Sequence, residues 1–151
     1  MQVTRRQALG LSAGAMAFVA LGPGLKAARA DEAATQKMLM DFTGGKEPAS
    51  GKITLTAPEI AENGNTVPIT VAVESEMTDA SYVESVTVLA EGNPNPEVAT
   101  FHFSPLSGEA TATTRMRLAK TQNVVAVAKM SDGSVFMDKK QVKVTIGGCG
   151  G

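Results

Sequence analysis

The sequence predicts an all-β protein, an antiparallel β-sandwich that ends in a flexible glycine-rich arm. The first observation is a series of short runs in which every second residue is apolar, the period of a strand with one buried face. The second is the clusters of Asn, Asp, Gly and Pro that separate these runs, with no strong helical pattern between them. The third is the last five residues, of which four are glycine.

Seven runs carry the strand pattern. They are residues 52–57, 66–74, 81–91, 98–103, 109–120, 123–129 and 134–146. The run 123–129 is apolar on both faces, as a central strand buried on two sides would be. Asp132-Gly133 predicts a hairpin after it. Seven short strands at this spacing are typical of an immunoglobulin-like sandwich, although the Cys…Trp…Cys pattern of antibody domains is absent.

The first thirty residues predict an export signal. Arg5 and Arg6 open a basic segment, residues 9–25 form an apolar run, and a small-x-small pattern places cleavage after Ala30. An apolar run of about 17 residues is marginal for spanning a bilayer core of ~30 Å, which favours cleavage over a retained anchor. The Arg5-Arg6 pair resembles a twin-arginine signal, with the general secretory route as the alternative.

The chain after the signal 1–30 divides into three parts. Residues 31–51 form an N-terminal segment, in which we expect a short helix at 33–40 and a linker marked by Gly and Pro residues. Residues 52–146 form the β-sandwich domain. Residues 147–151 form the arm.

Charge and reactive side chains exclude most classes of function. The signal holds four of the 14 basic residues and none of the 15 acidic ones, which leaves a net charge of −5. A mildly acidic chain without a basic amphipathic stretch predicts neither nucleic-acid binding nor membrane adsorption. One Cys and one His exclude a disulfide framework and a Cys-rich or His-cluster metal site. We therefore expect no metal and no cofactor, and chemistry that passes through Cys149.

The arm Gly147-Gly148-Cys149-Gly150-Gly151 carries the only thiol of the chain. The wide dihedral range and large ordering entropy of glycine predict an arm that is disordered alone and can enter narrow clefts. Fully extended, five residues reach roughly 15–18 Å. No His, Lys or Arg lies in the arm to promote thiolate formation, so we expect activation to come from a partner that binds the arm.

Other candidate residues are expected to have ordinary structural roles. His102 alternates with Phe101 and Phe103, so we expect it to face solvent or a partner. Arg115 and Arg117 share one strand face, which is more often solvated than an anion site, and they are a candidate partner contact. The six methionines after the signal are expected to fill the core and interfaces.

The export signal, the small all-β domain and the terminal Gly-Gly-Cys-Gly-Gly together resemble the SoxY family, the sulfur carriers of the periplasmic thiosulfate-oxidising Sox system. The resemblance covers the whole chain and is most specific at residues 147–151. It implies a periplasmic, non-catalytic carrier. It also implies that Cys149 is the covalent attachment point of sulfur intermediates in thiosulfonate, persulfide and sulfonate forms.

The resemblance further implies a set of protein partners. One is SoxZ, a second small β-sandwich protein that forms a heterodimer with the carrier. The loaded arm is expected to be presented in turn to a c-type cytochrome that conjugates thiosulfate, a manganese-dependent sulfate thiol hydrolase and a sulfur dehydrogenase.

Two alternatives stay open from the residues alone. The first is an exported interaction module that dimerises through an interchain Cys149 disulfide, since an odd cysteine in an oxidising compartment often pairs between chains. The second is a thiocarboxylate carrier, which also ends in Gly-Gly. Export away from cytosolic ATP and the lack of a β-grasp helix pattern argue against the second.

Overall fold

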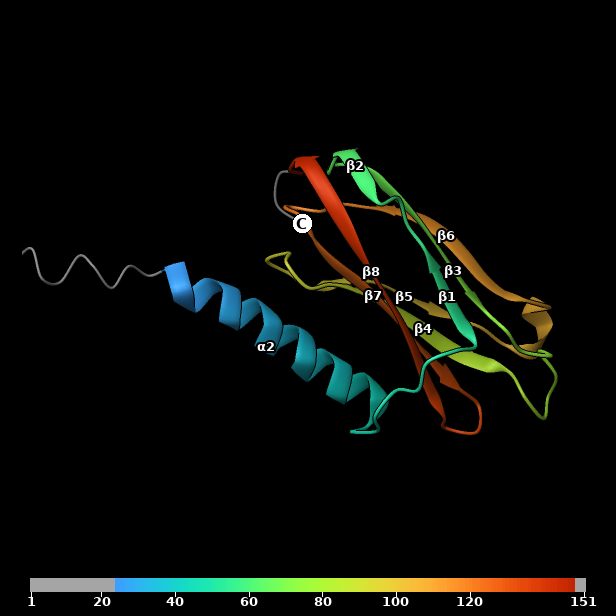
Figure 1. Ribbon diagram of the computed structural model, residues 1–151. Helices are drawn as coiled ribbons and strands as arrows, with labels where there is room; N and C mark the ends of the chain where they lie inside the picture. The colour runs from blue at the N-terminus through green and yellow to red at the C-terminus, as the bar shows by residue number, and fades with distance from the viewer. Residues whose placement is uncertain (1–23, 149–151) are drawn as a thin grey trace, which may run out of the picture.

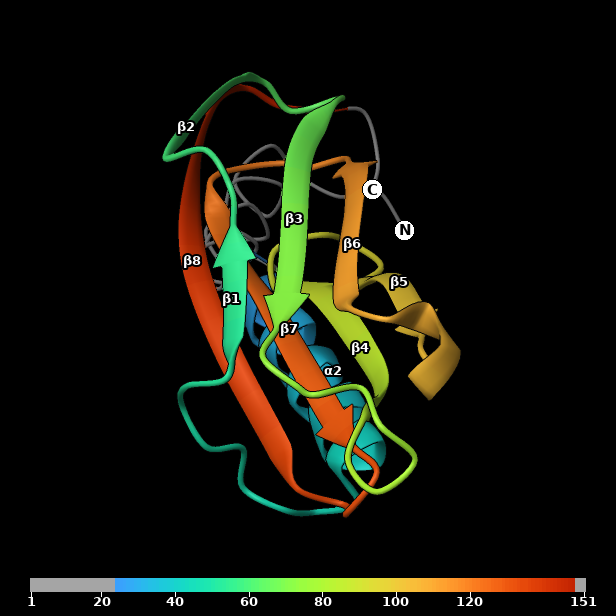
Figure 2. The ribbon, with the colours of Figure 1, turned by 90° about the vertical axis from the view of Figure 1, so that its right-hand side faces the viewer.

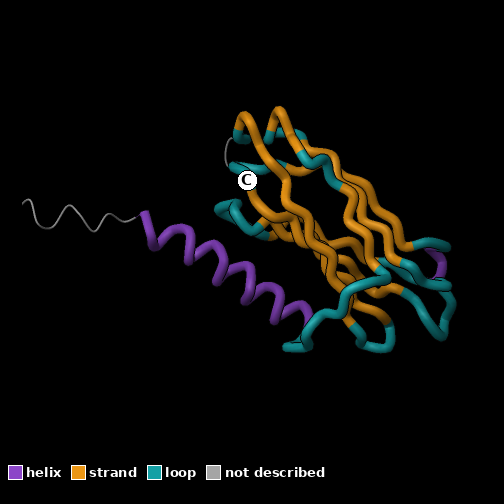
Figure 3. The backbone as a smooth tube through the Cα atoms, viewed as in Figure 1, coloured by secondary structure: helices purple, strands orange, loops and turns teal. Residues whose placement is uncertain are grey.

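Two β-sheets face each other, and an α-helix covers the outer face of the larger sheet (Figures 1 and 2). The computed structural model describes residues 24–148, and the side chains of residues 33–148. Figure 3 shows the same arrangement as two layers of strands with the helix to one side. Arg5 and Arg6 of the predicted export signal lie outside the described residues.

The elements follow one another along the chain as α2 (Gly24–Thr43), β1 (Ile53–Thr56), β2 (Ile60–Asn63), β3 (Val67–Val73), β4 (Val83–Ala90), β5 (Glu97–His102), the 3-10 helix η2 (Pro105–Ser107), β6 (Ala110–Met116), β7 (Gln122–Met130) and β8 (Val135–Ile146). The smaller sheet has the strand order β1-β3-β6, and the larger sheet has the order β2-β8-β7-β4-β5. Most consecutive strands therefore pass between the two sheets, as in immunoglobulin-like sandwiches, whereas β4–β5 and β7–β8 are neighbours in the larger sheet.

Each of the seven predicted runs overlaps one strand, which confirms the all-β sandwich. The pairs formed among these seven strands are all antiparallel. The prediction missed β2, which pairs with β8 in parallel, with Ala61 opposite Val144. Only Ala61 of the four β2 residues is buried, so this strand has no alternation of large apolar side chains that would reveal it.

The central strand β7 is buried on both faces, as the sequence predicts. Val124, Ala126 and Ala128 face the interior between the two sheets. Val125 and Val127 face the other way. A strand in this position loses solvent from both sides, which explains its unbroken apolar sequence.

The helix α2 covers the apolar side chains on the outer face of β7. Its Met38, Leu39 and Phe42 pack over Val125, Val127 and Leu89, together with Met137 of β8; each of the three covered side chains is at most 3% exposed. Burial of such a side chain contributes roughly 1.5–3 kcal/mol.

α2 runs from residue 24 to residue 43, longer than the predicted 33–40. The expected cleavage site after Ala30 falls within α2, and the packing residues lie after it. Among the described residues, no helix has the length and apolar character needed to cross a membrane.

Candidate functional site

The sequence directs attention to the C-terminal arm, and the structure describes the base of that arm. Gly147 and Gly148 are described, whereas Cys149, Gly150 and Gly151 lie outside the described residues. The base of the arm is therefore the part of the candidate site that can be built from contacts.

Three backbone segments meet at the base of the arm: the end of β8, the turn between β2 and β3, and the residues after β6 (Figure 2). The Gly64 N–H donates to the Ile146 carbonyl at 2.8 Å, and the Leu118 N–H donates to the Gly64 carbonyl at 2.7 Å. The Gly148 N–H donates to the Leu118 carbonyl at 2.9 Å. These bonds tie the chain to the sandwich beyond the last residue of β8.

Close packing as well as hydrogen bonding holds Gly147 and Gly148. A Cβ added at Gly148 would lie 2.8 Å from the carbonyl oxygen of Gly64, closer than real Cβ contacts come. A Cβ added at Gly147 would overlap the carbonyl oxygen of Ala119. Both opposing atoms belong to the backbone and cannot rotate away. Two of the five arm residues thus lie against the domain, and their glycine identity serves close approach as well as conformational freedom.

The segment that receives the arm is itself held by a buried amide. Asn93, only 2% exposed, donates from Nδ2 to the Arg117 carbonyl at 2.8 Å. Its Oδ1 accepts from the Ala119 N–H at 3.0 Å and from Gln122 Nε2 at 2.8 Å. In the sequence this Asn is one of the turn residues that separate two strand runs, and no local pattern marks it as a brace for a distant segment.

The remaining candidate side chains lie on β5, on β6 and in the segment after β6. His102 is exposed on β5, as expected. Arg115 and Arg117 are exposed, while Met116 and Leu118 between and after them are buried, which agrees with the predicted alternation. In residues 24–148, no group of His, Cys, Asp and Glu is arranged to hold a metal ion.

The methionines have mostly the structural role that the sequence predicts. Met77, Met116 and Met130 are buried in the sandwich core. Met38 and Met137 pack between α2 and the larger sheet. Met40 is the exception, because 61% of it is exposed on α2.

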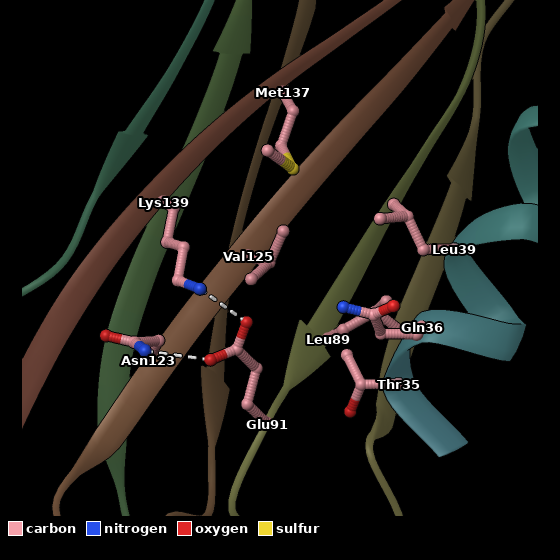
Figure 4. Close-up of a pocket in the computed structure, with 9 residues that line it drawn as sticks. All are labelled: Thr35, Gln36, Leu39, Leu89, Glu91, Asn123, Val125, Met137 and Lys139. Atoms are coloured by element: carbon pink, nitrogen blue, oxygen red, sulfur yellow. Dashed lines mark hydrogen bonds and ion pairs between the residues drawn. The ribbon is translucent and has the colours of Figure 1, made fainter. Parts of the chain in front are cut away.

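A cavity of about 410 Å³ lies between α2 and the larger sheet (Figure 4). Leu39 and Val125 line its apolar side. On its polar side, Glu91 accepts from Lys139 Nζ at 2.6 Å and from Asn123 Nδ2 at 2.8 Å. These three polar side chains bond one another, so none of the three is left without a partner.

One carboxyl group has a pKa that clearly departs from its ordinary value. Asp132, in the turn between β7 and β8, accepts hydrogen bonds from the Ser134 hydroxyl at 2.6 Å and from the Ser134 N–H at 2.8 Å. These bonds favour the charged carboxylate and lower the pKa of Asp132. Its partners are turn atoms, so the shift belongs to the hairpin.

Comparison with solved structures places the chain in the class of two-sheet β-sandwich domains. A superoxide reductase (neelaredoxin) from Ignicoccus hospitalis matches with a TM-score of 0.56 and 21% identity, over 63% of this chain and 81% of that chain. A putative superoxide reductase from Thermotoga maritima matches with a TM-score of 0.54 and 21% identity, over 69% and 90% of the two chains. Likeness at this level of identity concerns the fold alone.

A second set of matches is more specific. The sulfur carrier protein SoxY from Chlorobium limicola f thiosulfatophilum matches with a TM-score of 0.62 and 33% identity, over 76% of this chain and 98% of that chain. The family model described as sulfur oxidation protein SoxY matches residues 39–149. No curated protein sequence matches. The chain belongs to the SoxY family, which confirms the resemblance noted from its sequence.

Proposed function

We propose that this protein carries the sulfur intermediates of thiosulfate oxidation as covalent adducts of the Cys149 thiol. The observation that carries the proposal is the family match, which runs from residue 39 to Cys149, the only cysteine of the chain. A carrier needs one nucleophilic atom and no catalytic groups of its own, because each partner enzyme brings the base, metal or haem for its step. The protein acts as a carrier subunit and not as an enzyme.

Each step of the proposed cycle balances in atoms and electrons, and every intermediate is bound through the single sulfur atom of Cys149. The thiolate and the terminal sulfur of thiosulfate form an S–S bond, and the two electrons released pass to a c-type cytochrome partner. Water then attacks the sulfonate sulfur of this thiosulfonate. The oxygen of that water leaves as part of sulfate, and a persulfide stays on Cys149. A sulfur dehydrogenase removes six electrons from the persulfide with oxygen from three waters. A second hydrolysis releases sulfate from the resulting sulfonate and restores the thiolate.

The proposed partners follow from the chemistry that the arm lacks. Residues 147–151 hold no acid or base, so each partner is expected to enclose the arm and activate the sulfur. The c-type cytochrome, the manganese-dependent sulfate thiol hydrolase and the sulfur dehydrogenase fill these roles. A SoxZ-like β-sandwich subunit completes the carrier as a heterodimer.

The proposed location is the periplasm, reached through the export signal 1–30. Cleavage after Ala30 is compatible with the fold, because Met38, Leu39 and Phe42 of α2 stay in the mature chain and keep the larger sheet covered. N-terminal sequencing of the exported protein is expected to begin at Asp31. Replacement of Arg5 and Arg6 by Lys tests the twin-arginine route, and unimpaired export of that variant would favour the general secretory route.

Intact-mass measurement of the protein from cells grown on thiosulfate tests the carrier function. We expect adducts of sulfur and of thiosulfate that dithiothreitol removes in part. The Cys149→Ser variant is expected to show no adduct and no thiosulfate-dependent electron transfer with the partner enzymes, while its fold is unchanged. Gly108→Ala, a change in a remote turn that leaves the thiol in place, serves as the matched control.

Three results would overturn the carrier function. An unmodified mass under every growth condition would contradict covalent sulfur transport. A mass equal only to a disulfide-linked dimer would instead support the interaction module that pairs through Cys149. Adenylation of the C-terminal carboxylate would point to a thiocarboxylate carrier.

A further inference from the structure

We propose that Gly64 is a positioning residue for the carrier thiol: it holds Gly147 and Gly148 against the sandwich, so that Cys149 leaves the domain at one defined point. The purpose of this arrangement rests on the carrier function proposed above. The arrangement itself rests on backbone contacts of described residues.

Gly64 links the two segments that flank the base of the arm. Its N–H donates to the Ile146 carbonyl at 2.8 Å, and its carbonyl accepts from the Leu118 N–H at 2.7 Å. The Leu118 carbonyl then accepts from the Gly148 N–H at 2.9 Å. Gly64 thus connects the end of β8 to the segment on which Gly148 is docked.

The contact requires glycine at position 64 for reasons of space. A Cβ on Gly64 would overlap the carbonyl oxygen of Leu118 and lie 2.7 Å from the nitrogen of Gly148. Both atoms are backbone atoms, so no side-chain rotation relieves the overlap. Gly64 is not among the glycines with positive φ, so its backbone conformation alone would permit other residues. The turn is therefore glycine because both the segment after β6 and the arm pass close beside it.

The surface that receives the arm is held in place by hydrogen bonds that do not involve the arm. The buried Asn93 side chain bonds the Arg117 carbonyl and the Ala119 N–H, on either side of Leu118. Gln122 in turn donates to Asn93 Oδ1. The Leu118 carbonyl is thereby held in a defined position, with its oxygen aimed at the Gly148 N–H.

Docking of the base shortens the free tether of the thiol. With Gly148 docked, one Cα–Cα step of about 3.8 Å separates the domain from Cys149. With the base released back to Ile146, three residues span roughly 10 Å. Docking and release of the base therefore change the length of free chain before Cys149 by two residues, Gly147 and Gly148.

Hydrogen exchange of the Gly148 amide tests the docking directly, without any sulfur chemistry. In the wild-type protein we expect this amide to exchange at least about tenfold more slowly than an unstructured one. In Gly64→Ala the protection is expected to be lost, while the amides of β7 keep theirs. Gly108→Ala is the control, because Gly108 has a positive φ of 73° and open space around its Cα. It strains a turn without touching the arm.

A second variant decides the matter if Gly64→Ala does not fold. Gly148→Ala places its Cβ 2.8 Å from the Gly64 carbonyl oxygen, and the arm can relieve this overlap by lifting off an intact sandwich. It is expected to lose Gly148 protection with unchanged unfolding. Gly150→Ala, the same change beyond the thiol, is expected to keep that protection.

Three outcomes would overturn the inference. They are a wild-type Gly148 amide that exchanges at the unstructured rate, equal protection in wild type and Gly64→Ala, and equal protection in wild type and Gly148→Ala. In transfer assays with a thiosulfate-conjugating partner, Gly64→Ala is expected to raise KM severalfold with the thiol still fully alkylated by iodoacetamide. Absence of any adduct on the wild-type protein would contradict the carrier function and leave the exchange result standing.

Discussion

The helix α2 and the base of the arm are the two ends of the described chain, and they contact the sandwich in opposite ways. α2 uses side chains: Met38, Leu39 and Phe42 pack on the outer face of the larger sheet. The base of the arm uses only backbone atoms, because Gly147 and Gly148 have no side chains to offer. One end is held by burial of apolar area and the other by hydrogen bonds at close approach.

The difference determines how each end responds to substitution. Apolar packing weakens in proportion to the area lost, so it tolerates exchange among large apolar residues. Backbone docking at these distances does not tolerate even one added Cβ.

The largest expected effect on stability lies beneath the helix. Leu89 is 1% exposed and packs against α2, so Leu89→Ala is expected to lower the free energy of unfolding by about 2–5 kcal/mol. Urea denaturation measures this loss. Met40→Ala, on the exposed face of the same helix, is expected to change it by less than about 0.5 kcal/mol. Loss of Gly148 amide protection in Leu89→Ala would contradict the independence of the two ends.

Replacement of Asn93 is expected to affect both the stability of the domain and the position of the arm. Asn93→Ala leaves the Arg117 carbonyl and the Ala119 N–H without their partner and removes one of the two acceptors of Gln122 Nε2, which is expected to cost about 1–3 kcal/mol. The same change is expected to speed exchange of the Gly148 amide. Asn95→Ala, at an exposed position of the same loop, is the matched control. Unchanged Gly148 exchange in Asn93→Ala would show that the receiving segment needs no brace.

A smaller effect on stability, with a clear effect on mobility, is expected at Gly147. Its added Cβ in Gly147→Ala overlaps the Ala119 carbonyl oxygen, and the chain end relieves this by lifting away. We expect the free energy of unfolding to change by less than about 1 kcal/mol. Heteronuclear NOE values at Gly148 are expected to fall toward those of an unstructured tail. Values equal to the wild type would mean that the Ala is accommodated in the docked position.

The smallest effect is expected in the β7–β8 turn, far from either contact. Bonds from Ser134 lower the folded-state pKa of Asp132 below its ordinary value of 3.8, so they stabilise the fold above that pH. This contribution is lost as the pH falls through the lowered pKa. Asp132→Asn keeps an acceptor for the Ser134 N–H but does not titrate. Its stability is expected to depend less on pH below about 4, and an unchanged profile in acid denaturation would contradict the assignment.

Elements with strong local patterns were predictable from the sequence, and elements that depend on distant partners were not. The alternation that revealed β3 and the unbroken apolar run that revealed β7 reflect burial of their own side chains. β2 has one buried residue and exists because the edge of β8 offers it a parallel partner. Asn93 looks like any turn residue until the fold brings the segment after β6 beside it.

The sequence by itself determined the all-β class, most strands, the single thiol near the chain end and the family resemblance, because composition, period and a terminal motif are local properties. Only the tertiary structure decided that Gly147 and Gly148 lie against the domain beside Gly64. A glycine in a sequence is equally compatible with a flexible segment and with a close contact to another backbone segment. The choice between them depends on which backbone lies next to it, and that neighbour is more than 80 residues away in the chain.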